Sequence, residues 1–438
     1  MHFVLESISE FFVKVFETSS IHGFPYISRH DLHLLEKLFW ILILSVNFAF
    51  AYFAFSDQLN RYVENPTVQS VEMVSFSEIA KPSFTVCTIN FINKTKLAIL
   101  VEKVFGANNL SEHYEDYSKF IEIVATLNYT NSSLKRLESF ENLTNINNAN
   151  FLEIASEMYS DYPIIDSSSY MRVMTELNMC QSSSGLSNYQ SPTNVIEDMN
   201  SKKKMCTSIE VCRVSVTPIT PINTTLSRVF VTNFDEVTSG DNLDYVILTH
   251  SLILERNIIV DEIRADPKIR NFAPRGRKCK FPDEYNSKYY NVYTYNFCKM
   301  DCRINRALKY CGCVPFFYTV KLQPPIKFCN ITGLLCLSNK PEWFDATSCK
   351  CMKLCESIIL TKTSSKEQNL MFDGMLTIDL NFPKTSIKRG VLFDFDDLLV
   401  GFGGSFALFL GLSVLCIVEI LYYALELCMN IIINCMMQ

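Results

Sequence analysis

The stretch LLVGFGGSFALFLGLSVLCIVEILYYAL, residues 398–425, decides the fold because its twenty-eight residues carry only one charge, Glu419. A helix crosses a hydrocarbon core of roughly 30 Å with about 20 apolar residues, so this stretch can span a bilayer with length to spare. A second run, LFWILILSVNFAFAYFAF at residues 38–55, has eighteen residues without a charge. We therefore predict two membrane-spanning helices, at residues 38–56 and 398–426.

The segment between the two runs has two features of extracellular chain. Fourteen of the seventeen cysteines lie between Cys87 and Cys355, and an even number of cysteines suggests disulfides, which persist in oxidising compartments. The N-glycosylation pattern Asn-x-Ser/Thr occurs only in this segment, at Asn93, Asn109, Asn128, Asn131, Asn142, Asn223 and Asn330. We expect residues 57–397 to be extracellular and both ends, residues 1–37 and 427–438, to be cytosolic, as in a two-span protein of the plasma membrane.

Other interpretations of the apolar runs stay open. The first run could be a cleaved signal peptide, although 37 residues precede it and signal peptides place their apolar region nearer the start. The second could be a lipid-anchor signal, although Glu419 interrupts it and Glu426 with a polar tail follows it. The charges that flank the two runs do not indicate which side of the membrane each end lies on, because no Lys or Arg follows Leu425.

Composition and residue types exclude several function classes. The net charge of −6 gives no basic surface for a nucleic-acid partner. Around the two histidines of the middle segment, His113 and His250, no catalytic triad, metal cluster or carboxylate pair emerges. We therefore expect no enzyme activity, no cofactor and no structural metal.

The cysteine-dense stretch from Cys279 to Cys355 has spacings that can be interpreted geometrically. Cys298 and Cys302 are four residues apart in a helical pattern and so share one helix face. Cys349 and Cys351 are two apart and share one face of an extended segment. An antiparallel pairing of helix and extended segment would join them like rungs. A zinc site remains the alternative, since such spacings also suit a metal.

Two further segments predict sheet. Residues 226–254 are rich in β-branched and aromatic side chains. In residues 375–382, Leu376, Ile378, Leu380 and Phe382 alternate and so share one face of a strand.

Six motifs follow one another in order: Ile21-His22-Gly23 before the first run, Arg61-Tyr62 with Asn65-Pro66-Thr67 after it, KPSFTVC at residues 81–87, RKCKFPDE at 277–284, LKYCGCVPFF at 308–317 and GGSFALFLGLSVLCIVEILYY at 403–423. In this order they resemble the degenerin/epithelial sodium channel/acid-sensing ion channel superfamily, and within it the insect pickpocket-like subunits. A lone His-Gly or Gly-x-Ser would carry no information, but the ordered set is specific and covers nearly the whole chain.

The resemblance implies a membrane α+β fold: two transmembrane helices and a disulfide-rich extracellular domain with a β-sheet palm and β-ball core, a helical finger and a thumb at residues 279–355. It implies these disulfides: Cys279–Cys355, Cys298–Cys351, Cys302–Cys349, Cys311–Cys336, Cys313–Cys329, Cys87–Cys212 and Cys180–Cys206. It also implies a trimer, made of one subunit type or of several related ones.

For function, the resemblance implies a sodium-preferring, amiloride-sensitive cation channel subunit that an extracellular stimulus, chemosensory or mechanosensory, would gate. Gly411, Leu412 and Ser413 would form the selectivity filter, which sodium ions pass transiently. His22 with Gly23, and Asp397, would act in gating.

Physical arguments agree with a pore. Two helices cannot enclose an aqueous path, so several copies must assemble. Extended backbone at membrane depth is tolerated only where it lines a water-filled cavity, and a break at residues 411–413 would present carbonyls to a cation. Asp394 and Asp396 would concentrate cations at the pore mouth, and Glu419 would face an inner vestibule.

The chain also departs from the family pattern at several positions. Gly401 stands where acid-sensing members often have an acid, and Ala407 and Cys416 replace a Gly and a Ser. No Trp precedes Cys279, so the family's Tyr–Trp contact cannot form with Tyr62.

The rival hypothesis is a non-conducting cell-surface receptor, adhesion ectodomain or accessory subunit of the same topology. The extracellular ligand or stimulus cannot be inferred from these residues.

Overall fold

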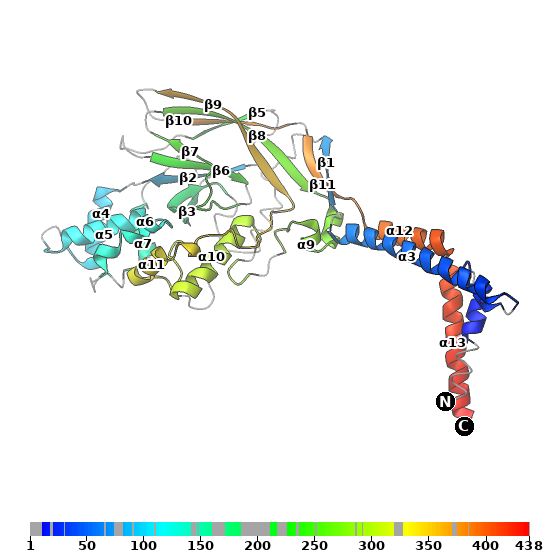
Figure 1. Cartoon of the computed structure of the whole chain (residues 1–438). Coiled ribbons are helices and arrows are strands. Elements are labelled where there is room, and N and C mark those ends of the chain that lie inside the picture. Colours follow the sequence, from blue (N-terminus) through cyan, green and yellow to red (C-terminus); the bar gives the residue numbers. More distant parts are fainter. Residues whose placement is uncertain are drawn as a thin grey trace. The chain divides into compact units, whose positions relative to one another are not determined.

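The computed structural model describes residues 11–17, 21–29, 31–64, 67–73, 82–89, 92–108, 111–141, 146, 149–159, 171–184, 211–216, 226–233, 236–249, 252–284, 287–290, 292–318, 327–369, 375–383 and 385–437. Its chain divides into two compact units (Figure 1). The helical unit comprises Met1–Val68, Asp266–Arg277 and Gly390–Gln438, and the disulfide-rich unit comprises Gln69–Ala265 and Lys278–Arg389.

Two sheets form the framework of the disulfide-rich unit. The larger has the strand order β1-β11-β8-β10-β5, with β9 also paired to β8. Its strands are β1 (Thr67–Met73), β5 (Val211–Val216), β8 (Leu252–Ala265), β9 (Ser357–Asn369), β10 (Met375–Asn381) and β11 (Thr385–Val391). The smaller has the order β3-β4-β2-β6-β7. Its strands are β2 (Pro82–Ile89), β3 (Met171–Thr175), β4 (Asn178–Ser182), β6 (Leu226–Asn233) and β7 (Tyr245–Leu248).

The alternating apolar pattern of β10 is confirmed. Leu376, Ile378 and Leu380 are fully buried, and they pack in one core with Phe84 of β2 and Val229 of β6. Alternate residues of a strand point to one face, so this face of β10 is buried against the smaller sheet. The sheet predicted for residues 226–254 is also present, as β6, β7 and the start of β8.

Helices of the same unit share a second core, and Figure 1 shows them grouped on one side of the sheets. They are α4 (Lys94–Phe105), α5 (Tyr114–Thr126), α6 (Asn131–Lys135), α7 (Phe151–Met158), α10 (Tyr295–Cys311) and α11 (Ile331–Ser338), with 3-10 turns η2 (Glu138–Phe140) and η5 (Pro341–Trp343). Trp343, Phe120 and Ile304 are fully buried there. A core of this size can hold the helices without support from the membrane.

Five disulfides lie in and around α10 and α11: three have a cysteine in one of these helices, and two join segments beside them. The rungs expected from spacing, Cys298–Cys351 and Cys302–Cys349, are both present, as is Cys279–Cys355. Cys311–Cys336 and Cys313–Cys329 complete the set that the resemblance implied. Because all four rung sulfurs are in disulfides, the zinc alternative for these cysteines is wrong.

The pairing expected for the other cysteines is wrong. The structure joins Cys87 to Cys180 rather than to Cys212. Cys87 of β2 stands directly opposite Cys180 of β4 in an antiparallel ladder, at a Cα–Cα distance of 4.3 Å. Such opposed positions place side chains close together, so the bond forms within one sheet. The backbone of Cys212 lies in β5 of the other sheet, opposite Leu380. Cys206 lies outside the described residues.

Four of the predicted glycosylation sites are described, and each asparagine is partly exposed: Asn93, Asn128, Asn131 and Asn330. Asn109, Asn142 and Asn223 lie outside the described residues.

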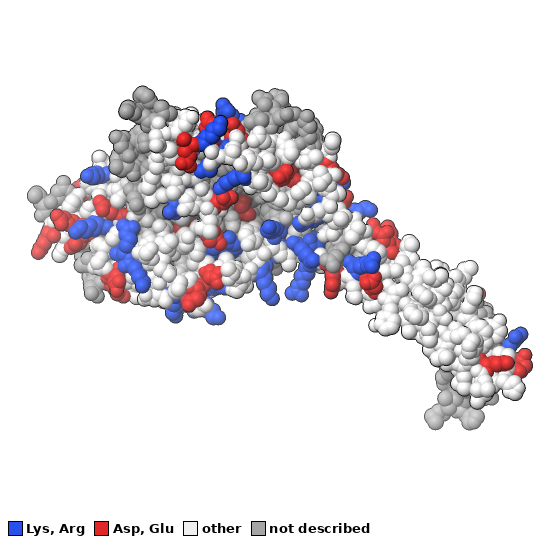
Figure 2. Space-filling view, turned by 45° about the horizontal axis from the view of Figure 1, so that its top comes forward, with Lys and Arg blue, Asp and Glu red and all other residues white. Residues whose placement is uncertain are grey.

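The helical unit is built from α2 (Phe24–Ser28), α3 (Leu34–Glu64), α9 (Pro274–Arg277), α12 (Phe395–Leu410), α13 (Val414–Met437) and the 3-10 turn η4 (Pro267–Asn271). Within the described residues, α3 alone is long and apolar enough to cross a membrane, and α12 and α13 meet that criterion together. In Figure 2 charges of both signs cover the disulfide-rich unit, whereas α3 and α12 show an almost uncharged surface.

A buried ion cluster joins α10 to loop residues of the disulfide-rich unit. Arg303 of α10 has no exposed side-chain surface, and its Nη1 lies 2.7 Å from Oε1 of Glu176, which is 1% exposed. Its Nη2 lies 2.9 Å from Asp241, and its Nε donates to the carbonyl of Phe344. Tyr318 donates to Glu176 at 2.7 Å. Removing one member of such a buried pair leaves an uncompensated charge.

We therefore expect Arg303→Met to lower the free energy of unfolding by about 3–5 kcal/mol, because the Glu176 carboxylate loses its cation. Removing both charges in Arg303→Met/Glu176→Leu should recover most of this loss. Lys309→Met, at an exposed position of the same helix, is the control. Urea unfolding followed by the fluorescence of buried Trp343 measures the effect. Equal stability of Arg303→Met and Lys309→Met would contradict the prediction.

The carboxylate of Glu236, beside the start of α10, lies where its charged form is disfavoured. Glu236 accepts the backbone N–H of Val237 at 3.1 Å and that of Asn296 at 3.3 Å. Burial nevertheless raises the pKa of Glu236 from 4.5 to about 7, because desolvation disfavours its charged form.

The native state therefore keeps a proton on Glu236 that the unfolded state releases between pH 4.5 and about 7. The part of the stability that this group contributes falls as pH rises through that window. We expect Glu236→Gln to flatten the pH dependence of the melting temperature there and to raise it most near neutral pH. Exposed Glu138→Gln should leave the profile unchanged. A Glu236→Gln profile parallel to that of the native chain would argue against the raised pKa.

Candidate functional site: the break between α12 and α13

The long apolar stretch that opened the argument is not one helix. It forms α12, which ends at Leu410, and α13, which begins at Val414, and the two axes differ by 80°. Residues 411–413 between them are Gly-Leu-Ser, where the sequence predicted a break (Figure 1).

Gly411 ends α12 with a left-handed turn. Its φ is +66°, and its N–H donates to the carbonyl of Ala407 at 2.9 Å while the N–H of Leu412 donates to Phe406 at 3.3 Å. The bond from the left-handed Gly411 to Ala407 is an αL C-cap, which satisfies a carbonyl that a helix end leaves without a partner. Glycine suits the position because it adopts positive φ without a steric penalty.

The loop around His22 docks onto this break. The backbone N–H of His22 donates to the carbonyl of Leu410 at 3.3 Å, so the loop supplies a partner for the last residue of α12. A Cβ at Gly411 would lie 2.4 Å from Nδ1 of His22. Two motifs at opposite ends of the sequence therefore meet, and Gly411 is needed for space as well as for its backbone conformation.

The same loop turns at Gly23, which has a φ of +99° and precedes the first helical residue of α2. A Cβ at Gly23 would lie 3.1 Å from the side chain of Leu44 in α3. The glycine therefore lets the loop approach the first apolar helix closely.

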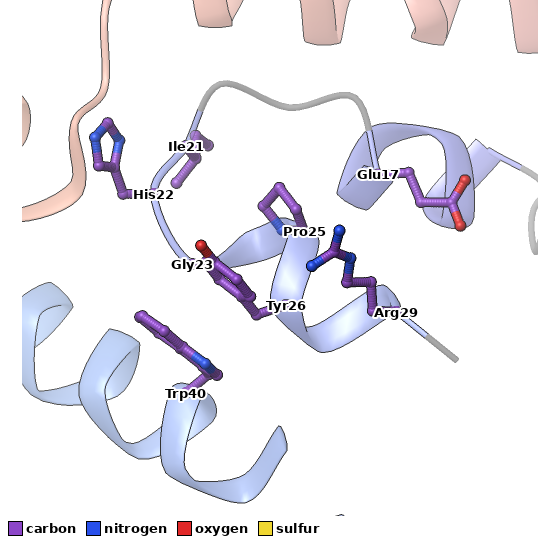
Figure 3. A pocket seen from close by; sticks show the side chains of 8 residues that line it. All are labelled: Glu17, Ile21, His22, Gly23, Pro25, Tyr26, Arg29 and Trp40. Carbon is purple, nitrogen blue, oxygen red and sulfur yellow. The ribbon is translucent and has the colours of Figure 1, made fainter. Parts of the chain in front are cut away.

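A cavity of about 720 Å³ lies beside the loop (Figure 3). The rings of Tyr26 and Trp40 stack at its wall, with centroids 4.4 Å apart. Glu17 and Arg29 bring charges of both signs to its edge. The remaining described lining residues are Ile21, His22, Gly23 and Pro25.

The other end of α12 begins with a capping box. Asp394 accepts the backbone N–H groups of Asp396 and Asp397, and Asp397 accepts that of Asp394. The backbone hydrogen bond from Asp397 is the main cause that lowers the pKa of Asp394, and Lys268 at 3.6 Å adds to it. Asp394, expected at a pore mouth, and Asp397, expected to act in gating, thus also fix the start of the helix.

Aromatic and small residues hold α3 against α12. Phe55 packs against Phe402 with ring centroids 5.2 Å apart. Gly401 lies against the end of the Gln58 side chain of α3, so a larger residue at this position would displace that amide. Gln58 also donates to Ser405 at 3.4 Å.

Comparison with known proteins now identifies the family. Residues 15–423 match the family described as amiloride-sensitive sodium channel. The chain belongs to this family. Its members are ion channels and not enzymes, which agrees with the expectation drawn from the residues.

Three relatives illustrate the similarity. The chain is 28% identical over 166 residues to the sodium channel protein Nach of Drosophila melanogaster, covering 34% of this chain and 31% of that protein. It is 25% identical over 228 residues to pickpocket protein 28 of Drosophila melanogaster, covering 45% and 37%. It is 27% identical over 164 residues to acid-sensing ion channel 1C of Danio rerio, covering 32% and 31%. The matched stretches span about a third of each relative's length.

The resemblance to the family predicted some of the residues at the break and missed others. His22 and Gly411 are brought together, whereas Glu419 is exposed on α13 beyond the break. Tyr62 does have an aromatic neighbour: the ring centroid of Phe272 lies 5.5 Å from that of Tyr62, where the family pattern has a tryptophan.

Lys14 was missed as well. Its Nζ lies 2.8 Å from Glu426 of α13, which raises the Lys14 pKa through their hydrogen bond. No local signal could have found this pair, because its members lie at opposite ends of the sequence.

We expect Gly411→Ala to destabilise the break by about 1–3 kcal/mol, because alanine is strained at positive φ and its methyl group meets His22. Amide hydrogen exchange at His22 in the solubilised full chain should then accelerate roughly tenfold or more. Gly404→Ala in α12 is the matched control, since a Cβ there meets no atom within 4 Å. Unchanged protection of the His22 amide from exchange in Gly411→Ala would contradict the prediction.

Proposed function

We propose that this chain is a subunit of a sodium-preferring cation channel and that Gly411, Leu412 and Ser413 form its selectivity filter. The break between α12 and α13 carries the proposal. Irregular backbone within an apolar stretch of spanning length is tolerated where it lines a water-filled path, and there it presents carbonyls to ions.

In the proposed topology α3 is the first span and α12 with α13 the second. The oxidised cysteines and the asparagine acceptor sites support an extracellular location for residues 57–397. Both termini would then be cytosolic and the protein would reside in the plasma membrane. The His22 loop would dock onto the filter from the cytosolic side.

Assembly follows from geometry. Two spans per chain cannot enclose a pore, so the proposal requires several subunits around one axis. A trimer, homomeric or formed with related subunits, is the arrangement we propose. Many side chains of α3 and α13 are exposed in the single chain, which leaves surface for lipid and for neighbouring subunits.

Gating would combine two regions. The His22-Gly23 loop contacts the break directly, so its displacement would change the filter. Asp397 would act at the outer end, where it already closes the capping box of α12. Amiloride sensitivity and an extracellular stimulus, chemosensory or mechanosensory, complete the proposal. The family description supports the first, and the name of one relative, an acid-sensing ion channel, supports a chemical stimulus.

The test is expression in voltage-clamped cells, alone and with related subunits. We expect Ser413→Ala and Gly411→Ala to reduce the sodium-over-potassium permeability ratio by roughly threefold or more, because both alter the filter backbone. Ser45→Ala is the control, since this α3 serine bonds only to its own helix at Ile41 among the contacts observed.

Surface labelling must accompany the currents. Normal surface delivery with unchanged selectivity in both filter variants would overturn the filter assignment. Surface delivery without any current in all subunit combinations would favour the receptor or accessory role instead.

A further inference from the structure

A thiol lies one turn beyond the break. Cys416 is in the first turn of α13 and is only 1% exposed. Three contacts join it to Ser413, the residue immediately before the helix.

The contacts are reciprocal. The backbone N–H of Cys416 donates to Oγ of Ser413 at 3.3 Å, and the backbone N–H of Ser413 donates to Sγ of Cys416 at the same distance. Oγ of Ser413 and Sγ of Cys416 are also 3.3 Å apart. This is the pattern of a capping box, in which the third helical residue reaches back to the residue before the helix.

The chemistry of this box is unusual. A capping box ordinarily closes with Glu or Gln, and the box at the start of α12 closes with the carboxylate of Asp397. Asp397 is exposed, so its charge remains solvated. A carboxylate at the buried position of Cys416 would have to lose its water, which is costly in an apolar segment. A thiol is neutral and still accepts a weak hydrogen bond.

The Ser413 N–H belongs to the irregular backbone between the helices. This N–H is part of the peptide group between Leu412 and Ser413, so its hydrogen bond to Sγ of Cys416 orients that peptide. The carbonyl of Leu412 lies in the plane of that peptide, because a peptide unit is planar. Holding the N–H on Sγ therefore fixes the direction in which the Leu412 carbonyl points.

We propose that Cys416 is a positioning residue of the selectivity filter. Through Sγ it orients the Leu412–Ser413 peptide, and so it sets ion selectivity without touching the ion. The inference rests on the proposed function of residues 411–413.

The experiment compares Cys416→Ser, which keeps an acceptor atom, with Cys416→Ala, which removes it. Both are measured as the full chain in voltage-clamped cells, with surface labelling. We expect the sodium-over-potassium permeability ratio of Cys416→Ala to fall roughly threefold or more, because the Leu412–Ser413 peptide loses the acceptor that orients it. Cys416→Ser should retain the native ratio. Cys428→Ala, at an exposed free cysteine of the same helix, should change nothing.

A second pair of variants separates loss of the acceptor atom from a packing or folding defect. Cys416→Thr and Cys416→Val have the same shape and differ by one hydroxyl, so a packing defect would affect both equally. The proposal predicts native selectivity for Thr and reduced selectivity for Val. Equal ratios in Thr and Val, or native selectivity in Cys416→Ala, would overturn it. If Ser413→Ala still shifts selectivity in those cells, the filter stands and only the role of Cys416 fails; if neither shifts it, the filter assignment fails too.

Discussion

A helix that stops inside an apolar segment must find partners for its last carbonyls and for the first N–H groups of the next helix. Where such a group is buried away from water, leaving it unpaired costs several kcal/mol, on the order of the stability of a whole domain. This chain meets the requirement with its own atoms. Gly411 turns α12 back on its carbonyls, the His22 loop reaches Leu410, and Ser413 with Cys416 closes the start of α13.

The constraint explains why distant parts of the sequence depend on one another. The loop at His22 and the pair Lys14–Glu426 both join the first residues to the second apolar stretch. A movement of the N-terminal segment would therefore remove a hydrogen-bond partner from the break. That connection provides a physical route from the N-terminal segment to the proposed filter.

The disulfide-rich unit is stabilised by other means. Three bridges hold α10 and α11, and the Arg303 cluster fixes α10 to Glu176 and Asp241 through buried charge. Disulfides restrict the unfolded chain, whereas the ion cluster specifies one arrangement of the folded one.

The sequence by itself determined the elements whose cause is local. Apolar length gave the spanning stretches, cysteine spacing gave the two rungs on α10, and Gly-x-Ser located the break, since each depends on residues close together in the chain. Tertiary structure decided what depends on distant neighbours. Cys87 bonds Cys180 because β2 and β4 happen to pair in that register, and Tyr62 finds Phe272 because η4 folds back beside α3. The contact of His22 with Gly411 and the thiol cap at Cys416 belong to the same class, because hydrogen bonds form where three-dimensional packing places donors and acceptors, and no pattern along the chain encodes that distance.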